Sequence, residues 1–117
     1  MFYGTQSFNQ PLNGWDVSKV TNMKRMFLGA IKFNQPLNEW KDKLGEVTDM
    51  REMFYWSAFD GKVDGWQLGK VTDMSNMFRQ AEAFNQPLNE WIFGQVKNMS
   101  GMFDGRQTLT NHWINGM

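Results

Sequence analysis

The 117-residue chain has no cysteine, a single histidine and no net charge, because twelve Lys and Arg balance twelve Asp and Glu. The missing cysteine excludes disulfide bonds and thiolate metal sites. The balanced charge offers no basic field for nucleic acid and no acidic tail for a basic partner. No apolar run approaches the roughly 20 residues of a transmembrane helix, and residues 1–7 have no signal-peptide pattern. We therefore expect no nucleic-acid partner and no membrane insertion.

What the chain does have is a repeated segment. Phe8, Phe33, Phe59 and Phe84 begin four similar stretches spaced 25 or 26 residues apart. A fixed period of about 20 to 50 residues is typical of a solenoid, in which each unit contacts only its neighbours. We expect one domain, 1–117, with a partial repeat at 1–7, repeats at 8–32, 33–58, 59–83 and 84–108, and a degraded partial repeat at 109–117.

Each repeat contains two local patterns. Trp15 and Val17 alternate with Asp16, which indicates a short strand with one buried face. The stripe that follows predicts a two-turn helix, because its apolar residues fall at i, i+3, i+4 and i+7: Met23, Met26, Phe27 and Ala30. Asn22 precedes this stripe and is predicted to cap the helix, as are the equivalent residues Asp49, Asp73 and Asn98.

The expected fold is an α/β repeat solenoid with one short parallel strand and one short helix in each 25–26-residue repeat. Stacked coils would place like residues above like. The predicted interior columns are Phe8, Phe33, Phe59 and Phe84; Trp15, Trp40, Trp66 and Trp91; and Met26, Met53, Met77 and Met102.

The stretch from Phe8 to Met23, Phe-Asn-Gln-Pro-Leu-Asn-Gly-Trp-Asp-Val-Ser-Lys-Val-Thr-Asn-Met, with Met26-Phe27 after it, resembles the BspA-like surface-protein repeat. That family is related to leucine-rich repeats and occurs in surface proteins of bacteria, in protists and in some large DNA viruses. The resemblance covers essentially the whole chain. It implies a right-handed leucine-rich-repeat-like coil, a location at a cell or particle surface, and a role in adhesion or protein binding, with no catalytic residues to carry over.

Two copies depart from this pattern. The second copy is longer between Trp40 and Val47, where Leu44 is expected to replace Val17 as the inward residue. The third copy has Asp60-Gly61-Lys62 in place of Asn-Gln-Pro, and Gly61 is expected to loosen the corner that proline fixes elsewhere. These two copies are the most plausible places for a partner contact.

Candidate chemistry is sparse. Most of the ten methionines occupy the apolar stripe and are expected in the core rather than at a copper site. His112 has no second histidine or cysteine nearby for a metal or a catalytic pair. Asn replaces Asp49 and Asp73 at matching positions, which favours capping over acid–base catalysis. We expect no enzyme activity, no metal and no cofactor.

The candidate partner-binding residues come from two places. The outward strand positions supply six of them, because in leucine-rich-repeat relatives this face usually binds. Trp56 lies outside the repeated Trp column and is either a gap-filler or an exposed anchor. The full set is Asp16, Glu39, Lys41, Trp56, Gln67, Glu90 and Ile92.

The sequence thus favours a non-enzymatic protein-interaction or adhesion module with a protein partner. The alternative is a structural subunit of a larger assembly, such as a particle shell or viral capsid. Neither end carries the polar capping repeat that a free solenoid needs, so end-to-end docking or continuation of a longer array is expected.

Overall fold

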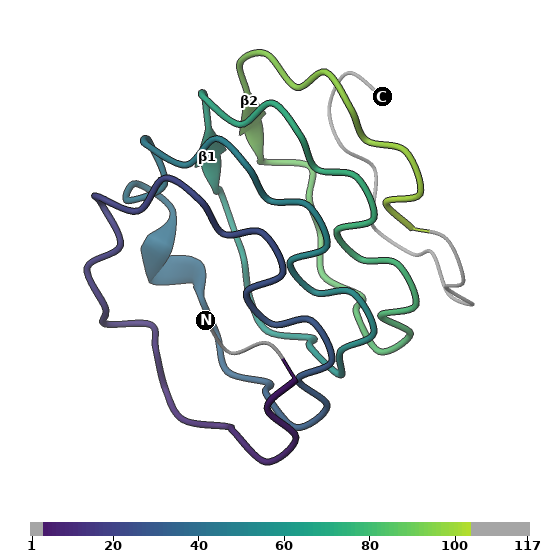
Figure 1. Cartoon of the computed structure of the whole chain (residues 1–117). Helices are drawn as coiled ribbons and strands as arrows, with labels where there is room; N and C mark the ends of the chain where they lie inside the picture. Colours follow the sequence, from purple (N-terminus) through teal and green to yellow (C-terminus); the bar gives the residue numbers. More distant parts are fainter. Residues whose placement is uncertain (1–3, 104–117) are drawn as a thin grey trace.

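The computed structural model describes residues 4–103, in which the chain winds through successive coils lying one upon the next (Figure 1). We number these coils first to fourth after the predicted repeats, the fourth being described to residue 103. Equivalent residues of neighbouring coils stack: the ring centroids of Phe33 and Phe59 are 5.9 Å apart, and those of Phe59 and Phe84 are 6.0 Å apart. Contacts therefore run from each coil to the next, as expected from the repeat.

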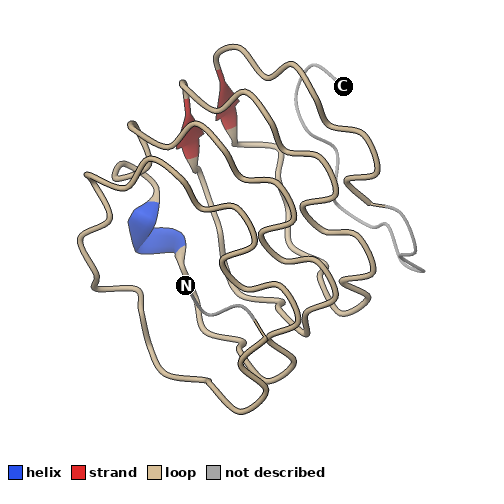
Figure 2. Ribbon diagram, in the orientation of Figure 1, coloured by secondary structure: helices blue, strands red, loops and turns tan. Residues whose placement is uncertain are grey.

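Regular secondary structure is scarce in the described range, and most of the chain is turn or loop (Figure 2). It consists of a 3-10 helix, η1 (Asn38–Trp40), and two strands, β1 (Gln67–Leu68) and β2 (Ile92–Phe93). The strands pair in parallel, with Gln67 opposite Ile92 and Leu68 opposite Phe93. The predicted strand is therefore present in the third and fourth coils. It is absent from the first two coils: residues 15–17 form no strand, and η1 ends just before Lys41, the position equivalent to Gln67.

The predicted helix after Val20 is not observed, because residues 23–30 form consecutive turns. Backbone amides of alternate residues close these turns: Met26 donates to the Met23 carbonyl and Leu28 to the Arg25 carbonyl. The intervening amides donate to the second coil instead, with 2.9 Å from Met23 to the Asp49 carbonyl and 2.8 Å from Phe27 to the Met53 carbonyl. Half of these amides thus bond between coils, where a helix would bond them internally.

The same arrangement recurs in the later coils, and we call it the turn stack (residues 21–29, 48–56, 72–80 and 97–103). Three parallel backbone bridges cross it, joining Asn22 to Asp49, Asp49 to Asp73, and Asp73 to Asn98. The described coils are hydrogen-bonded more extensively here than at β1 and β2. The turn stack, not the sheet, supplies most of the backbone bonds between coils.

Two columns, which run through the turn stack, hold the backbone at positive φ. One contains Arg25, Glu52, Asn76 and Gly101, and the other contains Gly4, Gly29, Trp56 and Gln80. Positive φ at the third residue of a hydrogen-bonded turn is the geometry of a type II turn, which favours glycine. A side chain there costs about 1–2 kcal/mol. Several non-glycine residues are therefore held in strained conformations by the stacking.

This strain gives a first prediction. Gln80 is exposed and has a φ of 56°, whereas Gly29 occupies the equivalent place in the first coil. Gln80→Gly should raise the free energy of unfolding by about 0.5–1 kcal/mol, because relief of strain exceeds the added entropy of the unfolded chain. Urea denaturation measures the change. The control is Gln95→Gly, at an exposed position without positive φ, which should be destabilising; equal effects of the two changes would contradict the assigned strain.

The core is built from aromatic ladders. The column from Phe8 to Phe84 stacks against a second column, Phe27, Phe54, Phe78 and Phe103, with centroids of Phe54 and Phe59 only 4.2 Å apart. The predicted methionine column is also buried, at 0–4% exposure. The placement of these methionines in the core is thus confirmed.

The buried tryptophans have a polar partner in each case. Trp40, Trp66 and Trp91 are 0–2% exposed. Each indole Nε1 donates to a carbonyl of the preceding coil, at 3.0 Å to Leu12, 3.0 Å to Leu37 and 2.8 Å to Val63 respectively. A buried indole N–H needs such an acceptor. The tryptophan column therefore joins neighbouring coils by hydrogen bonds as well as filling the core. Trp15, at its first-coil end, is 44% exposed.

The two irregular copies fold differently from one another. Leu44 is fully buried while Lys41 and Asp42 are exposed, which confirms the predicted inward replacement. The expected loosening at Gly61 is wrong. Gly61 is buried, and a Cβ at this position would collide with the backbone carbonyl of Gln35 in the second coil. Glycine here allows a close approach of two coils.

The right-handed leucine-rich-repeat-like class of the solenoid stays a prediction.

Candidate functional site

The structure brings three of the predicted residues together on the strand side. The backbone amide of Gln67 in β1 donates to the Lys41 carbonyl at 3.0 Å, and Gln67 is the register partner of Ile92 in β2. All three side chains are exposed, Ile92 by 58%. Lys41, Gln67 and Ile92 thus form one outward column across three coils.

The remaining strand-side residues flank this column. Lys41 and Glu90 line a shallow depression together with Asn38, Asp64 and Gly65. Glu39, in η1, is exposed and is positioned by its backbone amide, which donates to Asn13 Oδ1 at 2.8 Å. The surface is mixed in charge and mostly polar, so Ile92 is its main apolar contact.

Asp16 belongs to a local turn of the first coil. Hydrogen bonds from the Ser18 side chain and backbone amide hold the pKa of Asp16 below 3.8, and the charges of Lys43 and Lys19 act in the same direction. The carboxylate therefore stays ionised at neutral pH. No contact places it against Gln67 or Ile92 within residues 4–103.

Trp56 lies in the turn stack rather than on the strand face. Its side chain is 62% exposed, the largest value among the exposed large hydrophobic residues of the described chain. Its φ is 57°, in the column occupied by Gly4 and Gly29 in the first part of the chain. A bulky residue at positive φ is uncommon. Most of the indole is in contact with water, so this side chain contributes little to the core.

Two neighbours of Trp56 complete a small surface that we call the aromatic patch (Tyr55, Trp56 and Arg79). The Arg79 guanidinium lies over the Tyr55 ring at 5.9 Å from its centroid, within the range of a cation–π contact. The Trp56 backbone amide donates to the Arg79 carbonyl at 2.9 Å, which fixes the two coils together. Tyr, Trp and Arg are the residue types most enriched at binding hot spots.

The sequence prediction missed Arg79 as part of this patch. The signal was present in the substitution of Tyr55-Trp56 for Leu28-Gly29 in one coil and Arg79-Gln80 for the same pair in the next. Only the stacking shows that the ring and the guanidinium face each other.

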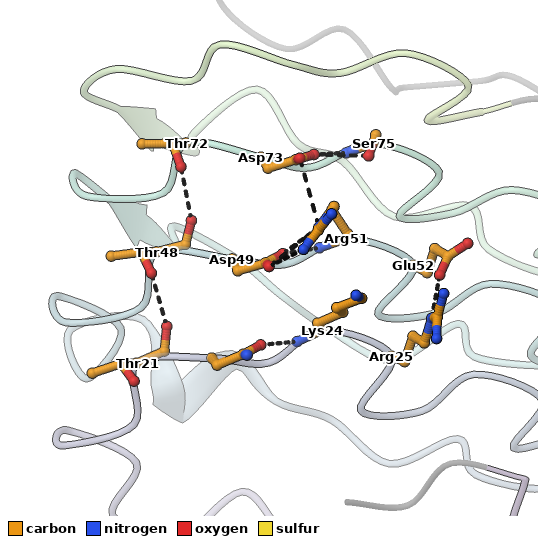
Figure 3. Close-up of polar contacts among 11 residues, drawn as sticks. Thr21, Lys24, Arg25, Thr48, Asp49, Arg51, Glu52, Thr72, Asp73 and Ser75 are labelled. Atoms are coloured by element: carbon orange, nitrogen blue, oxygen red, sulfur yellow. Dashed lines mark hydrogen bonds and ion pairs between the residues drawn. The ribbon is translucent and has the colours of Figure 1, made fainter.

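A polar network covers the neighbouring part of the turn stack (Figure 3). Arg51 donates to Asp49 at 2.8 Å and lies 3.6 Å from Asp73, while Arg25 pairs with Glu52. The side-chain oxygens of Asn22, Asp49, Asp73 and Asn98 accept the amide two residues on. These residues accept an amide as predicted, but in a turn rather than at a helix start. Their bonds are satisfied within the chain, so the network is structural.

The charge balance in this network gives a pH prediction. Burial alone would raise the pKa of Asp49, but hydrogen bonds and charge from Arg51 outweigh burial and hold it below 3.8. A depressed pKa stabilises the fold above the unfolded value, and this stability is lost as pH falls through the folded pKa. Between about pH 5 and pH 2, Asp49→Asn should therefore lose less unfolding free energy than the wild type, by at most about 1 kcal/mol.

Urea denaturation at several pH values measures the difference. Asparagine preserves the amide acceptor, as Asn22 does for Lys24. The matched control is Asp42→Asn, at an exposed residue of the second coil, which should follow the wild-type curve. Parallel curves for wild type and Asp49→Asn would show that the Arg51 pair contributes nothing.

Other kinds of site are not seen in the part of the chain that the structure describes. Within residues 4–103 no three His, Asp or Glu side chains are grouped so as to hold a metal. The same range contains no helix with the length and apolar content to cross a bilayer. His112 lies outside the described residues.

Comparison with known sequences gives one result. The sequence model of a family described as "Mycoplasma protein of unknown function, DUF285" matches residues 1–68 and, a second time, residues 41–115. Searches of curated proteins and of solved structures found no match. Two overlapping matches along one chain agree with an internally repeated sequence.

Proposed function

The chain belongs to the DUF285 family, and we propose that it is a non-enzymatic protein-interaction or adhesion module. We further propose that its repeats are BspA-like and that its coils form a right-handed leucine-rich-repeat-like solenoid. The partner is a protein. The observation that carries the proposal is Trp56, which is 62% exposed while Trp40, Trp66 and Trp91 are buried.

The position of Trp56 supports binding over packing. A side chain at positive φ is retained at a cost to stability, and such strain tends to collect at functional sites. The Arg79 guanidinium covers the ring of the preceding residue, Tyr55, and the Trp56 backbone amide donates to the Arg79 carbonyl. The strand-side column ending at Ile92 offers a second, more polar surface for the same partner.

The test uses the immobilised wild-type chain and the Trp56→Gly variant as parallel baits. The proposal requires at least one protein that the wild type retains and the variant loses. Identical sets of retained proteins would contradict the role of Trp56.

One observation favours a second candidate, a structural subunit of a larger assembly that docks through an exposed apolar face of the first coil. Trp15 is 44% exposed, whereas its counterparts in later coils are 0–2% exposed. With Val17, Val20 and Met23 it lines a hollow of about 290 Å³ on the first coil. Exposed apolar surface of this kind is typical of association surfaces.

Size-exclusion chromatography with light scattering separates the two candidates. A subunit that docks through this face should form oligomers whose mass rises with concentration, and Trp15→Lys should dissociate them into monomers. A monomer at high concentration would exclude self-docking and favour the interaction module.

A further inference from the structure

A shallow, open groove lies on the side of the coils where the chain returns toward the strands. It has a volume of about 460 Å³ and crosses the second, third and fourth coils. Its lining residues are Asn34, Pro36, Asn38, Asp60, Lys62 and Gln86, with Gly61. The volume lies in the range of about 300–1,000 Å³ of small-molecule sites.

The groove is centred on the one copy that departs from the repeat at this point. Residues 9–11, 34–36 and 85–87 are all Asn-Gln-Pro, whereas residues 60–62 are Asp-Gly-Lys. The three consensus copies have no charge here. The third coil therefore places one carboxylate and one ammonium group on an otherwise neutral surface.

Asp60 keeps the structural role of the asparagine that it replaces. Its Oδ1 accepts the Asn85 amide at 2.8 Å, as Asn34 Oδ1 accepts the Asp60 amide at 2.7 Å. An asparagine would serve this ladder equally well, as it does at Asn9 and Asn34. Stability of the stack thus does not explain the carboxylate.

Gly61 leaves the glutamine ladder of this groove without a side chain in the third coil. In the neighbouring coils Gln35 and Gln86 lay their amides over the preceding coil, donating to the backbone carbonyls of Asn9 and Asp60 at 3.1 Å and 2.9 Å. Gly61 supplies no such donor to Asn34, whose carbonyl accepts no hydrogen bond from the described residues. Within residues 4–103, Asp60 Oδ2 and Lys62 Nζ likewise have no intramolecular partner.

We propose that this groove binds a neutral saccharide. Amide side chains, a carboxylate oxygen and an ammonium group offer donors and acceptors close together, which matches hydroxyl groups that donate and accept at once. The Lys62 ammonium group would repel a cationic ligand and the Asp60 carboxylate would repel an anionic one. A neutral ligand therefore suits this pair of charges. The lining contains no aromatic side chain that would favour an aromatic ligand. The inference does not depend on the aromatic patch.

The test is NMR titration of the chain with glucose, galactose and N-acetylglucosamine, followed by the double variant Asp60→Asn/Lys62→Pro. This variant restores the residues of the other copies at both positions and keeps the acceptor for Asn85. It should unfold at the same urea concentration as the wild type. At least one sugar should shift the amides of Asn34, Asn38 and Gln86, and the variant should weaken its binding at least about tenfold.

Asp60→Asn alone is the milder variant and should give a smaller loss. Trp56→Gly should leave sugar binding unchanged, so failure of the protein-partner proposal and failure of this one are distinguishable. The inference is overturned if none of the three sugars shifts these amides, or if the double variant binds a sugar as well as the wild type does.

Discussion

Replacing Trp66 by alanine should lower the free energy of unfolding by about 3–5 kcal/mol. The Trp66 indole is fully buried between Trp40 and Trp91, with ring centroids 6.5 Å and 5.3 Å away. Its Nε1 also donates to the Leu37 carbonyl at 3.0 Å. The substitution leaves a cavity and an unpaired carbonyl in the middle of the stack. Since net stabilities are only about 5–15 kcal/mol, much of the fold's stability would be lost.

Circular dichroism during urea or thermal denaturation measures this loss, and two control variants divide it. Trp66→Phe keeps an aromatic ring but removes the N–H donor, so it should cost about 1–3 kcal/mol. Trp15→Ala makes the same change in the same column where the side chain is 44% exposed, and should cost less than Trp66→Ala. Equal costs at positions 15 and 66 would mean that stacking within the column does not carry the stability.

The inward residues could be predicted from the sequence, but the backbone beneath them could not. Met23, Met26, Phe27 and Ala30 are all buried, as the apolar stripe indicated. In the turn stack the pattern of turns has a period of four residues, because positive φ occurs at Arg25 and again at Gly29. Over eight residues a period of four gives nearly the same spacing as a helical period of 3.6. Only the destination of the backbone hydrogen bonds distinguishes the two structures.

Contacts between coils account for the rest of what the sequence did not predict. Local patterns do not show that Trp66 Nε1 reaches Leu37, because the two residues are separated by a full coil. The role of Gly61 was mispredicted for the same reason, since its requirement for glycine comes from the Gln35 carbonyl of the preceding coil. The cation–π contact that completes the aromatic patch also joins two coils. Sites built across the stack become visible only when the register is known.

The second large effect is expected at Trp56, in binding rather than in stability. Trp56→Ala removes an indole that is 62% exposed and keeps the positive φ, so the free energy of unfolding should change by no more than about 0.5 kcal/mol. Trp56→Gly also relieves the backbone strain, and should raise the free energy of unfolding by up to about 1 kcal/mol. Urea denaturation of both variants measures these changes. A loss of several kcal/mol in Trp56→Ala would show that the indole belongs to the core.

Both Trp56 variants should nevertheless weaken binding of the protein partner by about 2–4 kcal/mol, which is roughly 30- to 1,000-fold in Kd. The reason is that a central aromatic anchor is desolvated in the complex, while the less apolar contacts around it mainly exclude water. Surface plasmon resonance against the protein retained by the wild-type chain measures the change. The comparison variant is Ile92→Ala, which truncates a similarly exposed apolar residue of the second surface and should weaken binding less than Trp56→Ala. If Ile92→Ala weakens binding and Trp56→Ala does not, the strand face carries the partner and the aromatic patch does not.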